Sequence, residues 1–154
     1  MNNKPIGVFD SGLGGVNVLE TLEQLMPNEK FIYLADTKNA PYGDKTREEL
    51  EIIVENDIKT LVDFQVKLIV IACNTASTID IKSLSEKYNI EIISVVDGGV
   101  AEVNEEDKNI LLTATKATVD SKIYEKSILQ KYPSINIESV ACPGIVPNIE
   151  FLNP

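Results

Sequence analysis

Residues 67–75 have the sequence KLIVIACNT, and this stretch decides the fold class. The run from Leu68 to Ala72 is apolar at every position, so a strand formed here is expected to be buried on both faces. Strands of that kind are typical of the centre of a parallel sheet. Cys73, Asn74 and Thr75 follow at once. The stretch therefore predicts a central parallel strand with three chemically useful side chains at its carboxyl end.

On both sides of this strand, short β-branched runs alternate with longer amphipathic segments. The sequence Thr46-Arg47-Glu48-Glu49 is a capping box, which predicts the start of a helix. This alternation favours an α/β fold with a parallel sheet. The predicted strands are 6–9, 31–35, 67–72, 91–96, 109–113 and 135–140, and the predicted helices are 18–26, 46–61, 76–88, 99–104, 119–131 and 145–152.

Asp97-Gly98-Gly99 is predicted to form a turn, and it is the best candidate for a boundary between two units. We predict a first α/β sub-domain over residues 1–97, which carries Asp10 and Cys73. An incomplete second α/β sub-domain is predicted over residues 98–154. No internal repeat or low-complexity tract stands out between them.

Composition limits the function classes. The net charge of -10 would repel nucleic acids and anionic membranes, so neither is expected as a partner. No run approaches the roughly 20 apolar residues of a membrane span, and the N-terminus lacks the apolar region of a signal peptide. The two cysteines do not suggest a disulfide framework, which favours a cytoplasmic location. The absence of histidine removes the commonest metal ligand and the commonest general base, so any proton transfer must use Cys, Asp, Glu, Lys or Tyr.

The sequence Asp10-Ser11-Gly12-Leu13-Gly14-Gly15 follows the first predicted strand, where ligands bind in open α/β sheets. Its glycine spacing does not match the dinucleotide fingerprint, and no Gly-Lys-Ser/Thr follows. A carboxylate at Asp10 would repel a pyrophosphate but attract an ammonium group. The cluster therefore indicates a small cationic or zwitterionic ligand, with a simple strand-to-helix turn as the alternative.

Cys73 is predicted to lie at the end of a strand and the start of a helix. The positive end of a helix dipole favours a thiolate, so Cys73 is expected to be an activated thiol; a buried structural cysteine is the alternative. Asn74 and Thr75 add hydrogen-bonding groups, and Tyr42 with Gly43 supplies a hydroxyl and a turn. Together these clusters predict a small pocket suited to an amino-acid zwitterion.

These segments, in this order along the chain, resemble the glutamate racemase family within the aspartate/glutamate racemase superfamily. The resemblance implies a three-layer parallel-sheet fold and an isomerase that uses neither pyridoxal phosphate nor a metal. Two cysteines would act on opposite faces of the glutamate Cα, and D-glutamate would supply peptidoglycan and so cell-wall biogenesis and cell shape. The matching segments are residues 6–15, 36–37, 41–43, 73–76, 117–119 with Ser121 and Tyr124, and 141–143.

By the same resemblance, Cys73 is one of the two catalytic cysteines and Asp10 is the acid that assists it. The substrate-binding residues implied are Ser11, Tyr42, Gly43, Asn74, Thr75 and Thr118.

The family's second catalytic cysteine lies in a Cys-Thr-His motif, and this chain has no histidine. Cys142 matches a different family segment, Ala-Cys-Pro, and is not expected to be catalytic. The resemblance thus implies that the C-terminal part of the fold is missing and that the chain is weakly active or inactive alone. The missing part is expected to leave apolar surface uncovered around Val8, Phe9 and Leu19, which predicts a homodimer or a poorly behaved monomer.

Three alternatives stay open at this point. A racemase for aspartate or another acidic amino acid shares the strand-end cysteine. A non-catalytic glutamate-binding or regulatory protein would need only half of a two-cysteine site. An unrelated α/β domain could hold Cys73 as a structural residue.

Overall fold

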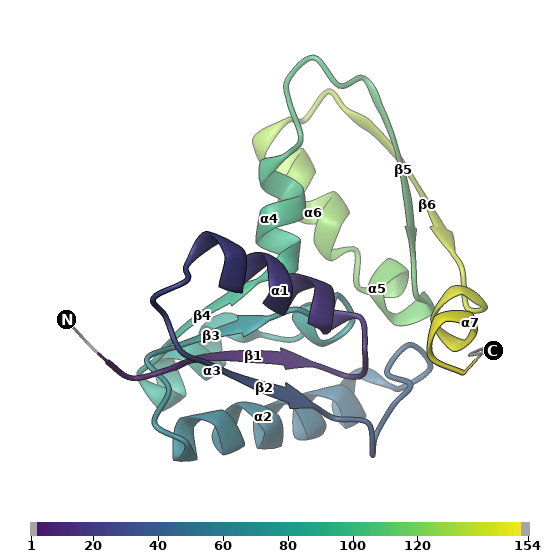
Figure 1. Ribbon diagram of the computed structural model, residues 1–154. Helices are drawn as coiled ribbons and strands as arrows, with labels where there is room; N and C mark the ends of the chain where they lie inside the picture. The colour runs from purple at the N-terminus through teal and green to yellow at the C-terminus, as the bar shows by residue number, and fades with distance from the viewer. Residues whose placement is uncertain (1–2, 152–154) are drawn as a thin grey trace.

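The computed structural model describes residues 3–151 and contains two parallel β-sheets (Figure 1). The first sheet has four strands in the order β2-β1-β3-β4, and the second has two, β5 and β6. All pairings in both sheets are parallel, which confirms the predicted α/β class. The strands are β1 (Ile6–Asp10), β2 (Phe31–Ala35), β3 (Leu68–Ile71), β4 (Glu91–Ser94), β5 (Asn109–Ala114) and β6 (Asn136–Ala141).

β1 and β3 form the centre of the first sheet. All five residues of β1 are buried, and Phe9 lies in register with Ile71 of β3. The expectation of uncovered apolar surface at Val8 and Phe9 is therefore wrong, because both side chains are fully buried among the described residues. The apolar run that begins at Leu68 therefore forms a central strand, as the sequence predicts. It ends at Ile71, so Ala72 and Cys73 belong to the loop that follows.

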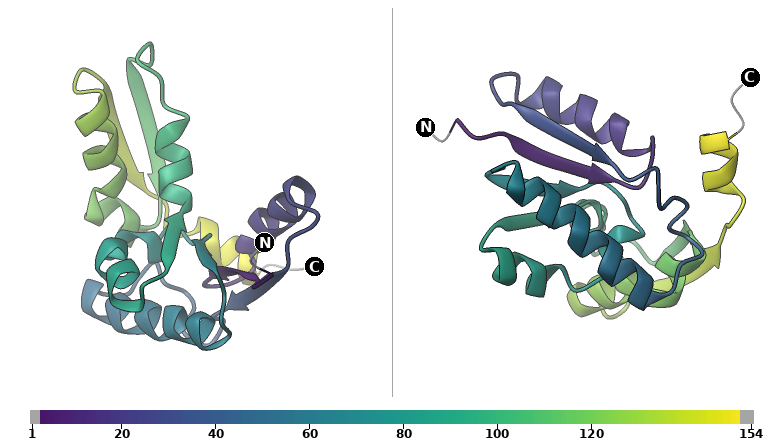
Figure 2. Two further views of the ribbon diagram at one scale, coloured as in Figure 1. Left: turned by 90° about the vertical axis from the view of Figure 1, so that its left-hand side faces the viewer. Right: turned by 90° about the horizontal axis from the view of Figure 1, so that it is seen from below.

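Helices cover both faces of the first sheet. α1 (Gly15–Leu25) lies on one face, and α2 (Arg47–Asp63) and α3 (Ile81–Tyr88) lie on the other (Figures 1 and 2). The predicted capping box is present at the start of α2, where Thr46 Oγ1 accepts from the Glu49 N–H at 3.2 Å and Glu49 Oε2 accepts from the Thr46 N–H at 2.8 Å. The apolar face of α2 packs into the core through Leu50, Val54, Ile58 and Leu61.

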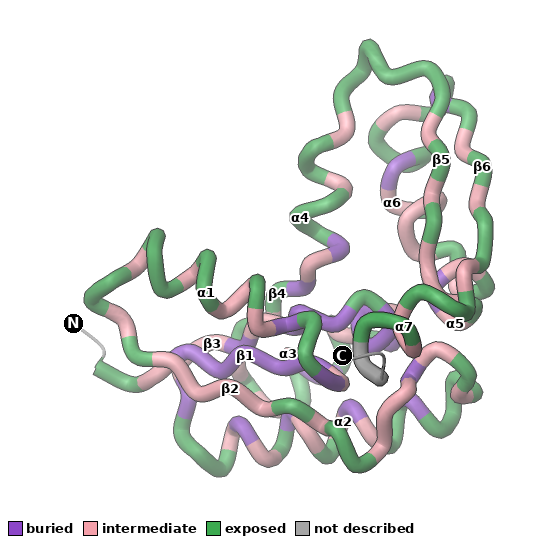
Figure 3. The backbone as a smooth tube through the Cα atoms, turned by 45° about the vertical axis from the view of Figure 1, so that its right-hand side comes forward, coloured by how far each residue is buried: buried purple, intermediate pink, exposed green. Residues whose placement is uncertain are grey.

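The second sheet is covered differently. Ser139 of β6 donates to Glu125 of α6 (Ile123–Lys131) at 2.5 Å, so this side chain marks the face that α6 covers. The opposite face, which we call the open face, carries Leu111, Thr113, Glu138 and Val140. Leu111 is 63% exposed and Val140 41% exposed, and Figure 3 shows the contrast with the buried strand β1 of the first sheet. Among the described residues, the open face thus leaves the apolar side chains Leu111 and Val140 without a cover, beside the polar Thr113 and Glu138.

The expected helix over 76–88 is interrupted. A three-residue 3-10 turn (Ala76–Thr78) follows Cys73, and α3 begins only at Ile81. Asp80 is the N-cap of α3, because its Oδ1 accepts from the Ser83 N–H at 3.1 Å. The α-helix therefore starts well beyond Cys73, and the prediction that Cys73 sits at its N-terminus is wrong.

The segment 97–99 is helical rather than a turn. Ser94 and Asp97 form a second capping box, so β4 ends at Ser94 and α4 (Val95–Ala101) begins earlier than predicted. The helix expected over 119–131 is two helices, α5 (Lys116–Ser121) and α6, separated by Lys122 with a φ of 55°. The helix expected to begin at Ile145 is α7 (Ile145–Phe151), and its predicted end at 152 lies outside the described residues.

α4 leads the chain from the first sheet to the second, packing against both β4 and α6. The predicted boundary between residues 97 and 98 therefore falls inside a helix, and the division into two sub-domains stays a prediction. Within residues 3–151, no helix has the length and apolar character needed to cross a membrane.

Candidate functional site

The order of strands in the first sheet creates a crevice at its carboxyl edge. The chain runs from β1 outward to β2 and then crosses back to β3 on the other side of β1. In open α/β sheets ligands bind at such a switch point, outside the carboxyl ends of the strands. Asp10 is the last residue of β1, and Cys73 follows the end of β3. The topology thus brings these two side chains to the same crevice.

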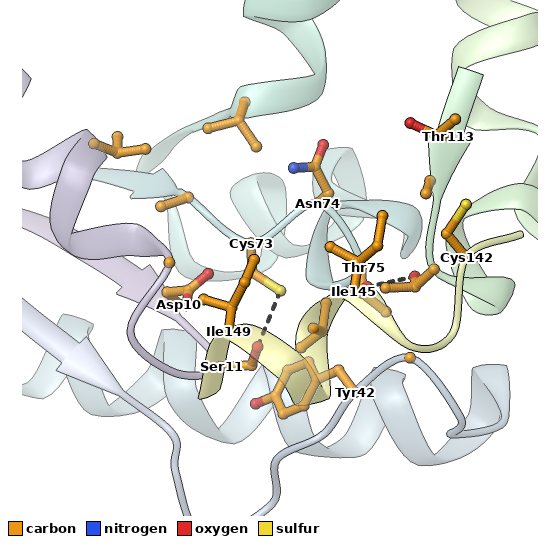
Figure 4. A pocket seen from close by; sticks show the side chains of 18 of the residues that line it. Asp10, Ser11, Tyr42, Cys73, Asn74, Thr75, Thr113, Cys142, Ile145 and Ile149 are labelled. Atoms are coloured by element: carbon orange, nitrogen blue, oxygen red, sulfur yellow. Dashed lines mark hydrogen bonds between the residues drawn. The ribbon is translucent and has the colours of Figure 1, made fainter. Parts of the chain in front are cut away.

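A cavity of about 630 Å³ opens at this place (Figure 4). This volume suits a small molecule. Most of the site residues predicted from the sequence line it together: Asp10, Ser11, Tyr42, Gly43, Cys73, Asn74 and Thr75.

Asp10 is buried and fixed by the turn that follows it. Its Oδ2 accepts from the Gly12 N–H at 2.8 Å, and the Gly12 carbonyl accepts from the Tyr33 hydroxyl at 2.8 Å. Gly15 must be a glycine here, since a Cβ would lie 2.5 Å from the Asp10 Cβ. The glycines after Asp10 therefore allow a helix to begin directly against the acid, which holds its carboxylate at the cavity.

The Cys73 thiol is only 6% exposed but lines the cavity beside Ser11. Its Sγ lies 3.4 Å from Ser11 Oγ and accepts from the Ala76 N–H at 3.4 Å (Figure 4). Burial and then the negative charge of Asp10 raise the pKa of the Cys73 thiol, and the bonds from Ser11 and Ala76 offset only part of this rise. The prediction of a thiolate favoured by a helix dipole is therefore wrong for this structure, and Cys73 carries its proton.

The hydroxyl of Tyr42 is not free to bind a ligand in the cavity, although the sequence predicted that it would do so. It donates to Asp36 Oδ2 at 2.6 Å and also lies 3.0 Å from Asp57 Oδ2. Burial and these two acids raise the pKa of Tyr42, so the phenol keeps its proton. Tyr42 thus anchors the loop that presents Gly43, and the Gly43 carbonyl is held in turn by the Ala117 N–H at 3.2 Å.

Thr118 lies behind the cavity rather than in its lining. Its side chain is 1% exposed, and its Oγ1 is 3.0 Å from Thr115 Oγ1 and 3.5 Å from Thr75 Oγ1. Thr75 and Thr115 do line the cavity and lie 2.9 Å apart through their hydroxyls. The three threonines form one hydroxyl cluster, in which Thr118 supports the two that a ligand could reach.

The second sheet and its helices supply cavity residues that the sequence analysis did not single out as binding residues. They are Leu112, Thr113, Ala114, Thr115, Tyr124, Cys142, Ile145, Val146 and Ile149. Thr113 and Thr115 lie at the carboxyl end of β5, and the strand-end rule could have found them. The α7 residues gave no such signal, because their position depends on how the two sheets are placed. Cys142 was not expected to be catalytic, and it nevertheless shares the cavity with Cys73.

Among residues 3–151, no three or more Cys, Asp or Glu side chains are grouped so that they could hold a metal ion. The polar groups that line the cavity are hydroxyls, an amide and a carboxylate together with two thiols. This set suits hydrogen bonding to a polar organic molecule.

No family model matches the sequence. Individual proteins do. The chain is 43% identical to glutamate racemase 2 of Caldanaerobacter subterraneus subsp. tengcongensis over 153 residues, which is 97% of this chain and 56% of that protein. It is 38% identical to glutamate racemase of Lactobacillus acidophilus, covering 97% of this chain and 57% of the relative. The crystal structure of Francisella tularensis glutamate racemase in complex with D-glutamate superposes with a TM-score of 0.91 at 38% identity, covering 97% of this chain and 57% of that one.

The fold of this chain is therefore that of the amino-acid racemases with parallel sheets. More narrowly, the chain is homologous to the N-terminal portion of glutamate racemases, as its sequence predicts. It spans about 56% of the length of the first of these relatives.

Proposed function

We propose that this chain forms the Asp10 and Cys73 half of a cofactor-independent racemase site for glutamate. One observation carries the proposal: a buried acid and a buried thiol lie at the switch point of a parallel sheet and line one small cavity. The ammonium group of the amino acid would lie near Asp10. Ser11, Asn74 and Thr75, with the backbone around Gly43, offer donors for its carboxylates.

Protonated Cys73 fits this chemistry. A bound ammonium group would offset the charge of Asp10, which is one of the two causes that raise the thiol pKa. Cys73 would then lose its proton more readily when substrate is present than when it is absent. The thiolate so formed would remove the proton from Cα, which is a weak acid and needs a poised base.

Inversion at Cα needs a second proton-transferring group on the opposite face. The resemblance assigns that role to a cysteine in a Cys-Thr-His motif, which this sequence does not contain. We therefore propose that the chain alone is weakly active or inactive. In the complete reaction, D-glutamate would serve peptidoglycan assembly in the cytoplasm. Both cysteines are free thiols, which supports a reducing compartment.

The test is exchange of the α-proton of L- and D-glutamate with deuterated solvent, followed by NMR, together with a direct assay for racemisation. Exchange at one enantiomer without racemisation is the expected result, and Cys73→Ala should abolish it. Cys142→Ser is the matched control, because it changes the other thiol of the same cavity. Racemisation that survives Cys142→Ser but not Cys73→Ala would overturn the two-thiol account. Parallel assays with aspartate decide between the two acidic substrates.

A second candidate is binding of glutamate without catalysis. The absence of the Cys-Thr-His motif favours it, because half of a two-cysteine site could bind glutamate without inverting Cα. Calorimetric binding of glutamate with no α-proton exchange in wild-type chain would support this candidate over the first.

We also propose that the chain self-associates as a homodimer through the open face of β5–β6. Parallel sheets are normally covered on both faces. A second copy would cover the exposed side chains Leu111 and Val140.

A further inference from the structure

Tyr124 reaches the cavity from α6, on the far side from Asp10 and Cys73. Its hydroxyl lies 2.5 Å from Asn74 Oδ1, and both residues line the cavity. Asn74 directly follows Cys73, so this bond joins the second sheet's helix to the loop that carries the thiol. Tyr124 takes no part in the hydrogen bonds of Asp10, Cys73 and Tyr42 at this site.

The two ends of the Asn74 amide offer opposite chemistry to a ligand. The oxygen accepts hydrogen bonds and the NH₂ group donates two. Burial, and then the charge of Asp97, raise the pKa of the Tyr124 phenol, so it stays protonated and acts as a donor. A donor at Oδ1 engages the acceptor end of the amide. The NH₂ end then stays available for a negatively charged group in the cavity.

Gly99 of α4 leaves space for the Tyr124 ring in the position where its hydroxyl reaches Asn74. A Cβ at Gly99 of α4 would lie 3.1 Å from the Tyr124 ring and 3.3 Å from its hydroxyl. The left-handed residue Lys122 separates α5 from α6 just before Tyr124 and so sets the direction in which α6 leaves. Gly99 therefore has a packing reason of its own, since a Cβ there would force Tyr124 to shift by a few tenths of an ångström.

We propose that Tyr124 is a positioning residue that fixes the orientation of the Asn74 amide, so that its NH₂ group faces a carboxylate of the bound amino acid. This inference rests on the proposed function, because the carboxylate belongs to the proposed substrate. It assigns a specificity role to a residue outside the first sheet, acting through Asn74 rather than by contact with the substrate.

The first test is the binding of D- and L-glutamate by calorimetry in a double-mutant cycle of Tyr124→Phe and Asn74→Ala. Tyr124→Phe removes the hydroxyl and keeps the ring against Gly99. We expect it to weaken binding by about two- to tenfold, the range for loss of one hydrogen bond. In the Asn74→Ala background the same change should have no effect. Tyr132→Phe, at the end of the same helix, is the matched control. Equal binding by wild type and Tyr124→Phe, or an equal loss in both backgrounds, would overturn the proposal.

The second test needs no ligand. The side-chain amide signals of Asn74, identified by their loss in Asn74→Ala, should shift in the NMR spectrum of Tyr124→Phe and stay in place in Tyr132→Phe. Unshifted signals would overturn the inferred orientation. If wild type binds neither enantiomer while these signals shift, the glutamate proposal fails and the Tyr124–Asn74 bond stands.

Discussion

The two sheets of this chain are built to different degrees of completeness. In the first sheet, β1 is buried along its whole length and helices cover both faces. In the second sheet, exposed and half-buried residues alternate along β5, and the face opposite α6 is open. The first sheet therefore holds the core and the reactive groups Asp10 and Cys73 in place. The second sheet contributes the far wall of the cavity from a less buried framework.

The sharpest test of this comparison is a large-to-small change in each sheet. Phe9 of β1 is fully buried and packs beside the Tyr42 ring, with centroids 6.3 Å apart. Phe9→Ala should lower the free energy of unfolding by about 3–5 kcal/mol, as for other buried aromatic residues. Leu112→Ala in β5 should cost clearly less, because Leu112 is only half-buried. Urea denaturation followed by circular dichroism measures both.

Equal losses for Phe9→Ala and Leu112→Ala would contradict the comparison. A loss of about 5 kcal/mol can approach the whole stability of a small domain, so Phe9→Ala can fail to fold. Phe9→Leu keeps the test usable, since it removes less volume at the same position.

A smaller effect on the free energy of unfolding is expected from the titration of Asp57 on α2. Burial raises the pKa of Asp57 on α2 from 3.8 to about 6; the Tyr42 hydroxyl offsets part of this rise, and the charge of Asp36 adds to it. The folded chain therefore binds this proton more tightly than the unfolded chain. The resulting stabilisation is fully present below pH 3.8 and is lost as the pH rises through about 6.

Asp57→Asn should remove this contribution while keeping the shape of the side chain and a polar group beside the Tyr42 hydroxyl. Above pH 6 the variant should be at least as stable as wild type, because it no longer buries a charge. Thermal unfolding of both proteins between pH 4 and pH 8 gives the difference, which cancels the titration of exposed acids common to both. A difference that does not change with pH would show that Asp57 titrates normally.

The sequence predicted the order of strands and helices because its apolar periodicity is local. Leu68 to Ile71 form a central strand because both faces of the run are apolar. The errors come from polar side chains that compete for backbone groups. Asp80 caps α3 and separates it from the 3-10 turn after Cys73. The Ser94–Asp97 capping box makes α4 begin at Val95, earlier in the chain than predicted. Spacing alone does not show which of several candidate caps a helix uses.

The site was predictable where residues follow a strand of the first sheet. Asp10 and Cys73 were found by that rule, and they do line one cavity. The α7 residues depend on the placement of one sheet against the other, which no local pattern encodes. Tyr124 stood among the segments that carry the family resemblance, but its position in the cavity depends on the same placement. The protonation of Cys73 was mispredicted because it is set by burial and by the nearby charge of Asp10, and both arise only on folding.

The smallest effect on stability, and the last test of the comparison, concerns the open face of β5–β6. Leu111 is 63% exposed, so Leu111→Lys should change the free energy of unfolding by no more than about 0.5 kcal/mol. If a second copy of the chain covers this face, the same change should lower self-association measured by light scattering over a range of concentrations, since it places a charge in an apolar contact. Leu25→Lys is the matched control, because Leu25 of α1 is 74% exposed beside the complete first sheet. Loss of association in Leu111→Lys alone would locate the contact on the incomplete sheet. Equal loss in both variants, or a wild-type chain that stays monomeric at every concentration, would show that exposure on this face does not drive pairing.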